Sequence, residues 1–238
     1  MSSPAAPPPA ASSRDVLARR VLDVAPALLG CHVTTVLDGG TVTARITEVE
    51  AYDGAADPGS HAFRGRTPRN AVMFGPPGHL YVYRHLGLHF CANVVTGAEG
   101  SASAVLLRAG EIVEGRELAR ARRLERGVVR TDADLARGPA RLAAALGLDL
   151  TVAGADLLAA TSTVRLVLPP TIPVRYATGP RVGVAGLGGD ADRFPWRFWL
   201  VGEETVSAYR RAAAPRVRER RGTSRSDAAP PDPRGTAH

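Results

Sequence analysis

Lysine is absent from this chain of 238 residues, and all thirty basic residues are arginine. Arginine stays protonated and cannot act as a neutral amine nucleophile, which excludes Schiff-base chemistry by a lysine side chain. Phosphate chemistry of the P-loop type is excluded as well, because its motif requires a lysine. The amine nucleophile that remains is the N-terminal amine, which stands in proline-rich surroundings.

Cysteines are scarce, and no long apolar run occurs. Cys31 and Cys91 are too few for a disulfide framework or a zinc site, and their apolar surroundings predict reduced core residues of a cytoplasmic protein. His85 and His89 have the spacing of a metal pair on a helix, but Gly87 lies between them and no third ligand follows. We therefore expect no metal and no cofactor. No apolar run approaches the ~20 residues that span a bilayer, and no secretory signal begins the chain, so we expect no membrane association.

The charge balance favours an anionic partner. The net charge is +7 and the isoelectric point is near 10.3, which suits a nucleic acid better than a membrane surface, because no basic amphipathic helix stands out. The length suits one domain, which we place at residues 14–211. Residues 1–13 are rich in proline, alanine and serine and predict a disordered tail. Residues 212–238 predict a second disordered tail, rich in arginine, which is either solvated or a nonspecific phosphate-binding arm.

Hydrophobic periodicity predicts an α+β domain rather than a βαβ array. We expect a single antiparallel, open-barrel-like sheet built from hairpins and surrounded by helices. A Gly-rich turn at residues 38–40 favours a hairpin between the first two strands. The expected strands are 32–37, 41–52, 79–83, 89–95, 103–108, 164–168 and 197–201. The expected helices are 14–29, with Ser13 as N-cap, 111–124, and 135–146, which is entered or interrupted at Gly138-Pro139.

Alternation along strand 41–52 places Glu48, Glu50 and Tyr52 on one face, with Ile46 deeper on the same side. Two acids and a tyrosine cannot be buried together without partners. The face is therefore either exposed to solvent or part of a functional site.

A second strand repeats this pattern with rings, since Tyr81, Tyr83 and His85 share one face. With five tyrosines in the whole chain, this is a concentration that favours a pocket for a flat, electron-poor ligand. His61 lies nearby in an arginine-rich loop, where a lone histidine is usually just exposed. Leu86 at the hairpin tip, beside Arg84, is either an ordinary turn residue or a wedge that enters a base stack.

The chain resembles the alkyladenine (3-methyladenine) DNA glycosylase family in an ordered set of motifs from about Leu28 to Val201. No single motif is convincing alone, but their order is specific. The motifs are Thr47-Glu48-Val49-Glu50-Ala51-Tyr52, Ser60-His61, Arg66-Thr67-Pro68-Arg69-Asn70, Met73-Phe74, Pro77-Gly78-His79-Leu80-Tyr81-Val82-Tyr83, Phe90-Cys91-Ala92-Asn93, Ala104-Val105-Leu106-Leu107-Arg108-Ala109, Gly138-Pro139-Ala140-Arg141-Leu142, Pro180-Arg181-Val182-Gly183-Val184 and Pro195-Trp196-Arg197-Phe198.

The resemblance implies a role for each residue of the pocket. Glu50 corresponds to the general base that activates water, and Arg108 to an arginine that supports this water and the phosphate of the target nucleotide. Asn93 corresponds to the residue that crowds the 2-amino group of guanine. The walls that sandwich the flipped base correspond to Tyr52, His61 and Tyr83.

The resemblance also implies a DNA surface. Leu86 stands where vertebrate-type members insert a tyrosine into the gap left by the flipped base, so this chain departs from them. A leucine can still wedge apart a base step but loses stacking area, and stacking is worth ~1–3 kcal/mol per base. Arg84, Arg66 and Arg69 are the accompanying candidates for DNA binding.

The implied activity is that of a monofunctional DNA glycosylase of base excision repair. It would act as a monomer on double-stranded DNA and remove 3-methyladenine, 7-methylguanine, hypoxanthine or ethenoadenine. Because lysine is missing, the reaction should end at an abasic site without lyase cleavage. Two alternatives stay open at this point: a nucleoside or glycoside hydrolase that uses Glu48 and Glu50 as a carboxylate pair, and a non-catalytic module that only binds and bends DNA.

Overall fold

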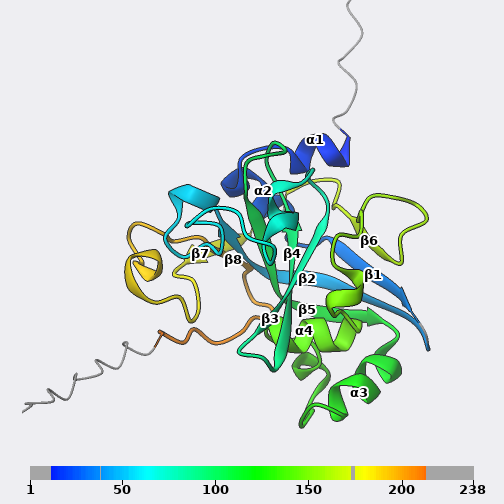
Figure 1. Cartoon of the computed structure of the whole chain (residues 1–238). Coiled ribbons are helices and arrows are strands. Elements are labelled where there is room, and N and C mark those ends of the chain that lie inside the picture. Colours follow the sequence, from blue (N-terminus) through cyan, green and yellow to red (C-terminus); the bar gives the residue numbers. More distant parts are fainter. Residues whose placement is uncertain (1–11, 38, 173–174, 213–238) are drawn as a thin grey trace, which may run out of the picture.

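The computed structural model describes residues 12–37, 39–172 and 175–212. Within them, one antiparallel sheet has the strand order β3-β4-β5-β2-β1-β6, and β8 pairs with both β2 and β7. The sheet does not close into a barrel. The predicted single α+β domain with an open antiparallel sheet is confirmed (Figure 1). The strands are β1 (His32–Leu37), β2 (Gly40–Tyr52), β3 (Leu80–His85), β4 (His89–Val95), β5 (Ala104–Glu114), β6 (Val164–Val167), β7 (Tyr176–Gly179) and β8 (Arg197–Leu200).

Helices cover one face of the sheet. The helices α2 and α4 pack on the central strands, and their buried side chains belong to the same apolar cluster as the inward residues of β2, β4 and β5. The opposite face of β3, β4 and β5 carries polar and aromatic side chains and is left for the site described below. The α-helices are α1 (Ser13–Leu17), α2 (Val21–Ala27), α3 (Arg116–Leu124) and α4 (Pro139–Leu146). Short 3-10 turns are η1 (Gly54–Ala56), η2 (Ala71–Phe74), η3 (Asp132–Asp134), η4 (Leu150–Val152) and η5 (Gly186–Gly189).

The predicted helix at residues 14–29 is wrong as a single element, because it is divided into α1 and α2. Leu17 and Val21 are both buried, and the turn between the two helices brings each of them to the core. The N-cap is Ser12 rather than Ser13, since Ser12 and Asp15 satisfy one another's backbone N–H groups in a capping box.

The strand β5 is longer than predicted, and residues 111–114 belong to it rather than to a helix. Ile112 pairs with Ala44 of β2 and is buried in the main core, so tertiary packing decides its conformation. The helix begins only after Gly115, whose φ of 72° turns the chain out of the strand. The helix predicted at 135–146 is entered at Pro139, one of the two alternatives for Gly138-Pro139, and proline suits the first helical turn. The strand β7 was not predicted.

Two β-bulges at the centre of the sheet decide which side chains face the functional side. Ile46 and Glu48 pair with adjacent residues of β5, so Thr47 is an extra residue in β2. This insertion reverses the alternation. Ile46 faces the helices within the main core, whereas Glu50 faces the other side. The prediction that Ile46 shares a face with the two glutamates is therefore wrong.

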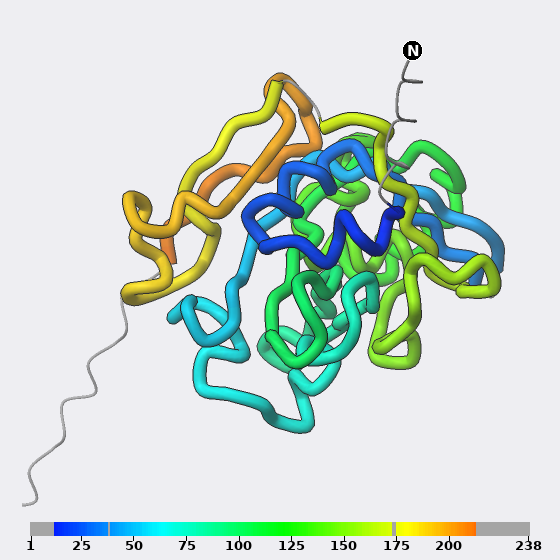
Figure 2. The backbone as a smooth tube through the Cα atoms, turned by 90° about the horizontal axis from the view of Figure 1, so that it is seen from above, coloured from blue at the N-terminus to red at the C-terminus, as the bar shows by residue number. Residues whose placement is uncertain are grey.

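Segments far apart in sequence meet at one end of the sheet. The loop that follows β2 lies beside the segment around η5, as the cyan and yellow tubes in Figure 2 show. The approach is close: a Cβ on Gly188 would stand 2.3 Å from the backbone nitrogen of Gly59. No helix among the described residues is long and apolar enough to cross a membrane. The predicted tails fall outside the described residues, except for residues 12, 13 and 212.

Candidate active site

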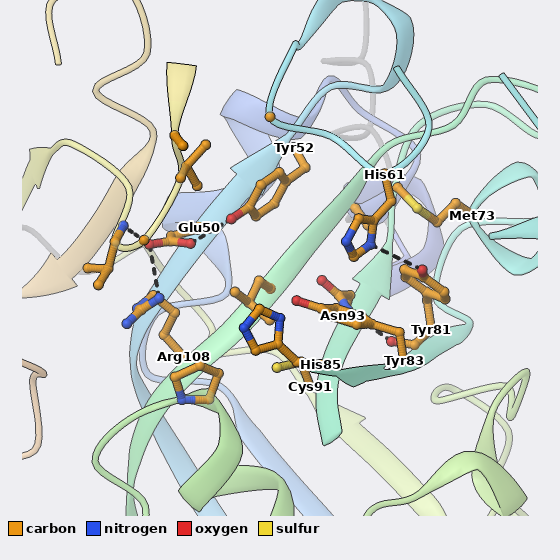
Figure 3. Close-up of a pocket in the computed structure, with 18 of the residues that line it drawn as sticks. Glu50, Tyr52, His61, Met73, Tyr81, Tyr83, His85, Cys91, Asn93 and Arg108 are labelled. Carbon is orange, nitrogen blue, oxygen red and sulfur yellow. Dashed lines mark hydrogen bonds and ion pairs between the residues drawn. The ribbon is translucent and has the colours of Figure 1, made fainter. Parts of the chain in front are cut away.

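A cavity of about 370 Å³ opens on the sheet face opposite the helices. The structure brings six predicted site residues together around it (Figure 3). The residues come from β2, the loop after it, β3, β4 and β5, so the cavity depends on the long-range register of the sheet. The six are Glu50, Tyr52, His61, Tyr83, Asn93 and Arg108.

Glu50 is fully buried at one end of this cavity and is held by two hydrogen bonds and one ion pair. The Tyr52 hydroxyl donates to Oε2 at 2.8 Å, and the backbone N–H of Val182 donates to Oε1 at 2.7 Å. The Arg108 guanidinium lies 3.1 Å from Oε1. These contacts fix the orientation of the carboxylate without closing every acceptor position.

Arg108 is the extra residue of a bulge in β5, which turns its side chain toward both glutamates of β2. Its Nε donates to Glu48 at 2.8 Å. Glu48 is fully buried and also accepts from Arg197 Nε at 2.6 Å and from the backbone N–H of Ser207 at 2.8 Å. Glu48 does not line the cavity, so its role is to position Arg108.

Aromatic rings form the walls of the cavity. The Tyr83 ring is stacked near Tyr81, with centroids 5.7 Å apart, and meets the His61 ring edge-on at 4.5 Å. The Tyr52 ring stands on the other side of the cavity (Figure 3). Tyr81, Tyr83 and His85 all line the cavity, as expected of side chains that share one face of their strand. The gap between the rings suits a flat ligand.

Burial sets the protonation of these rings. Burial and the nearby Glu50 charge raise the pKa of Tyr52, so its hydroxyl remains a donor to that carboxylate. Burial also raises the pKa of Tyr83. Burial, with the charges of Arg69 and His85, lowers the pKa of His61 below its usual value of 6.5. His61 is therefore neutral at pH 7 and adds no repulsion against a cationic ligand.

Asn93 occupies the floor of the cavity. Its side-chain amide nitrogen donates to the carbonyl of Tyr81 at 3.0 Å, which leaves the amide oxygen on the other side. Cys91 lies beside it on β4, and burial raises the pKa of this thiol. The thiol therefore stays protonated and is a poor nucleophile.

The structure adds residues that reasoning from the sequence missed. Val182 supplies a backbone donor to Glu50, and the fully buried Arg181 beside it pairs with Asp57 through contacts of 2.5 and 2.7 Å. The Arg181 guanidinium also lies 4.5 Å from the centroid of the Tyr52 ring. The motif at 180–184 was recognised without a role, and an arginine between proline and valine gives no signal of burial.

The predicted DNA-binding residues lie outside the cavity on its exposed rim. Leu86 is 80% exposed at the tip of the β3–β4 hairpin, with a φ of 49°. Arg84 lies over Phe90 of the next strand, with 5.2 Å between guanidinium carbon and ring centroid. Arg69 lies over Tyr83 at 5.5 Å, and Arg66 is exposed on the same loop.

No group of three or more potential metal-ligating His, Cys, Asp or Glu side chains occurs in the described part of the chain. His85 and His89 face one another across the last pair of the β3–β4 hairpin, so they do not form a helical pair.

The sequence was compared with protein-family models and with known relatives. The model of the methylpurine-DNA glycosylase (MPG) family matches residues 15–204. A protein of Streptomyces avermitilis is 54% identical over 90% of this chain and 98% of its own length, and one of Leifsonia xyli is 54% identical over 84% and 93%. A Mycobacterium tuberculosis protein is 50% identical over 78% and 88%. All three are provisionally named 3-methyladenine DNA glycosylases. The chain belongs to the methylpurine-DNA glycosylase family.

Proposed function

We propose that this protein is a monofunctional DNA glycosylase that rotates alkylated or deaminated purines out of duplex DNA and hydrolyses their N-glycosidic bond with a water activated by Glu50. The observation that carries the proposal is the buried Glu50 carboxylate, which two hydrogen bonds and one ion pair hold at one end of a cavity with aromatic walls. The proposed substrates are 3-methyladenine, 7-methylguanine, hypoxanthine and ethenoadenine. The product is an abasic site, the intermediate of base excision repair.

The hydrogen bonds of Glu50 define where the water binds. Each carboxylate oxygen has two acceptor positions. Oε1 accepts from the Val182 N–H and forms an ion pair with Arg108, whereas Oε2 accepts from Tyr52 alone. The free position on Oε2 supports an attacking water bound there. As the base leaves, Glu50 stabilises the oxocarbenium-like sugar and takes a proton from this water, whose oxygen bonds to C1′.

The ring walls recognise the damaged base. Alkylation at a ring nitrogen makes the purine cationic and a better leaving group, and the faces of Tyr52 and Tyr83 attract such a ring. Because His61 is neutral at pH 7, it packs against the base without repelling its charge. The Asn93 side chain crowds the position of a guanine 2-amino group and so rejects undamaged guanine.

Leu86 and the arginines of the rim act on the duplex. Rotating a base out of the stack costs a few kcal/mol, which an inserted side chain offsets by filling the gap. Leu86 and Gly87 both have positive φ, and the N–H of Leu88 donates to the His85 carbonyl, as in a type I′ turn. A leucine is strained in this conformation, which supports a functional reason for its exposure. Arg66, Arg69 and Arg84 then neutralise phosphates.

The decisive experiment replaces Glu50 by glutamine, which preserves the shape of the side chain but removes the base. We expect Glu50→Gln to bind duplex oligonucleotides that carry one lesion and to excise the base about 10²–10⁴-fold more slowly, the usual contribution of a general base. Excision is measured by alkaline cleavage of the abasic site under single-turnover conditions. Glu117→Gln, an exposed glutamate of α3, is the matched control. Retained excision by Glu50→Gln would refute the mechanism.

The alternatives predict different outcomes in the same assays. A nucleoside or glycoside hydrolase would act on free nucleosides. Glu48 is hydrogen-bonded to two arginines and does not line the cavity, so it is not available as the second carboxylate of a catalytic pair. A non-catalytic module would give the same result for wild type and Glu50→Gln. Absence of lyase activity is tested by borohydride trapping, in which we expect no covalent adduct with abasic DNA because no lysine is present.

A further inference from the structure

A second cavity, of about 240 Å³, lies on the other side of β4 from the cavity that receives the base. Neighbouring residues of β4 face different cavities, since Cys91 lines the first and Phe90 the second. The start of α4 is divided in the same way, with Pro139 at the first cavity and Arg141 at the second. Figure 1 shows the tip of the β3–β4 hairpin and the helices α3 and α4 at the same lower end of the molecule.

This second cavity carries surplus positive charge. Arg123, Arg126 and Arg141 line it, and the one carboxylate paired with any of them in the described part of the chain is Asp134, 3.1 Å from Arg141. Burial and the charges of Arg141 and Arg126 lower the pKa of Arg123, although Asp134 opposes this. An anion in the cavity would relieve the repulsion among these guanidinium groups.

Arg123 is the residue that points to a ligand. It is 5% exposed, and its Nε donates to the Leu135 carbonyl at 3.1 Å. Its two terminal nitrogens have no hydrogen-bond or ion-pair partner among the described residues, although the side chain lines the cavity. These terminal nitrogens keep contact with solvent, and their planar fork matches the oxygens of a phosphate.

We propose that the second cavity binds a backbone phosphate of the same duplex whose damaged base occupies the first cavity, an inference that rests on the proposed function. Phe90 pairs with Arg84 across the hairpin, and Arg84 is two residues before Leu86, roughly 7 Å at ~3.3 Å per residue. This corresponds to about two base pairs at ~3.4 Å each. A bound phosphate therefore lies about two base pairs from the inserted leucine.

A DNA phosphate fits better than a free anion because the cations continue from the hairpin to the helices. The guanidinium carbons of Arg84 and Arg126 lie 5.2 and 6.0 Å from the centre of the same Phe90 ring. Arg84 belongs to the hairpin that carries Leu86, and Arg126 follows α3. The two arginines thus form a continuous cationic track along which one strand can run from the wedge to the second cavity.

The test measures how binding to DNA depends on salt. The probe is a duplex with a tetrahydrofuran abasic analogue, which cannot be cleaved, and its dissociation constant is measured between 50 and 200 mM salt. The variants are Arg126→Ala, at an exposed position, and Arg123→Gln, with its fold checked by thermal unfolding. Arg130→Ala, an exposed arginine that does not line the cavity, is the matched control. Neutral methylphosphonates placed singly along each strand locate the contact.

For Arg126→Ala we expect the slope of log K against log salt to fall by about 0.9, the value for one phosphate contact, with no change for Arg130→Ala. One methylphosphonate, about two base pairs from the lesion, should weaken binding by the wild type and have no further effect on binding by Arg126→Ala. Equal slopes for Arg126→Ala and Arg130→Ala, or additive effects of the variant and the methylphosphonate at every phosphate, would overturn the proposal. If the wild type bound lesion-bearing and undamaged duplex equally, the proposed function would fail. The phosphate site would still stand if the salt slopes of the wild type and Arg126→Ala differed.

Discussion

Replacing Arg181 by methionine tests how the fold holds the two groups that orient Glu50. The Arg181 side chain donates to Asp57, to the Ala51 carbonyl and to the Gly188 carbonyl, all in the buried interior. Methionine keeps an apolar stem against the surrounding rings but leaves the Asp57 carboxylate without its cation. Breaking a buried pair by removing one partner typically costs about 3–5 kcal/mol.

This value translates into a measurable shift. For a domain of this size, about 1 kcal/mol corresponds to roughly 2–4 °C in Tm, so Arg181→Met should melt roughly 6–20 °C lower. Asp57→Asn removes the same pair from the other side while its amide oxygen can still accept from the Gly59 N–H. The two substitutions combined should destabilise by about 0.5–3 kcal/mol less than the sum of the single effects, since they remove one shared interaction.

Urea denaturation of the wild type, the two single variants and the double variant measures this coupling. Single-turnover excision is measured in parallel well below the lowest Tm. We expect the folded Arg181→Met to excise about 10²-fold more slowly, because a shift of about 1 Å in the Val182 donor or the Tyr52 ring displaces Glu50. A free energy of unfolding within about 1 kcal/mol of wild type, the range of an exposed pair, would refute the energetic reasoning. An unchanged excision rate would refute the positioning role.

Three further substitutions test the site and its rim. Glu48→Gln should slow excision and destabilise the fold by about 1.5–3 kcal/mol, since Arg108 and Arg197 lose a charged acceptor. Urea denaturation and single-turnover assays measure the two effects, and an unaltered stability and excision rate would contradict the prediction. Leu86→Asn should relieve the strain of the left-handed turn and raise Tm, yet weaken binding to abasic duplex. Leu86→Tyr should tighten this binding, and equal affinities of the wild type and both variants would exclude a wedge. Because the pKa of His61 is lowered, its neutral ring contributes stability above pH 6.5, and this contribution is lost as the pH falls toward the folded-state pKa. Excision of cationic bases should decline over the same pH range. Wild type should therefore lose more stability than His61→Gln between pH 7.5 and 5, and identical profiles would contradict this.

Part of the cavity could be predicted from local patterns, whereas His61, Asn93 and Arg108 were assigned only by the family resemblance. Alternation identified Tyr81, Tyr83 and His85 as one face, and the structure places all three at the cavity. The hairpin tip at Leu86 was also predictable, since glycine follows it between two strands. Helix 14–29 and residues 111–114 were predicted wrongly, because local periodicity does not show how a segment packs against the sheet.

The partners of Glu50 required the three-dimensional register. Val182 reaches Glu50 from 132 positions along the chain, and Arg181 reaches Asp57 from 124. Such pairs have no local signal, and a single sequence contains no covariation that would reveal them. The burial of both glutamates was unpredictable for the same reason, since strand alternation allowed a solvent-exposed face equally well.

The paired bulges explain why this part of the sheet can hold an acid and an arginine in contact. Thr47 is extra in β2 and Arg108 is extra in β5, so the register is restored beyond Glu48 and the strands remain paired through Tyr52. Without the first bulge, Glu50 would face the apolar core on the side of Ile46, where a charged carboxylate would have no partner. Without the second, Arg108 would not point at the carboxylates. A sheet that alternates regularly would thus bury either the acid or the arginine, and the two irregularities together place both at the cavity.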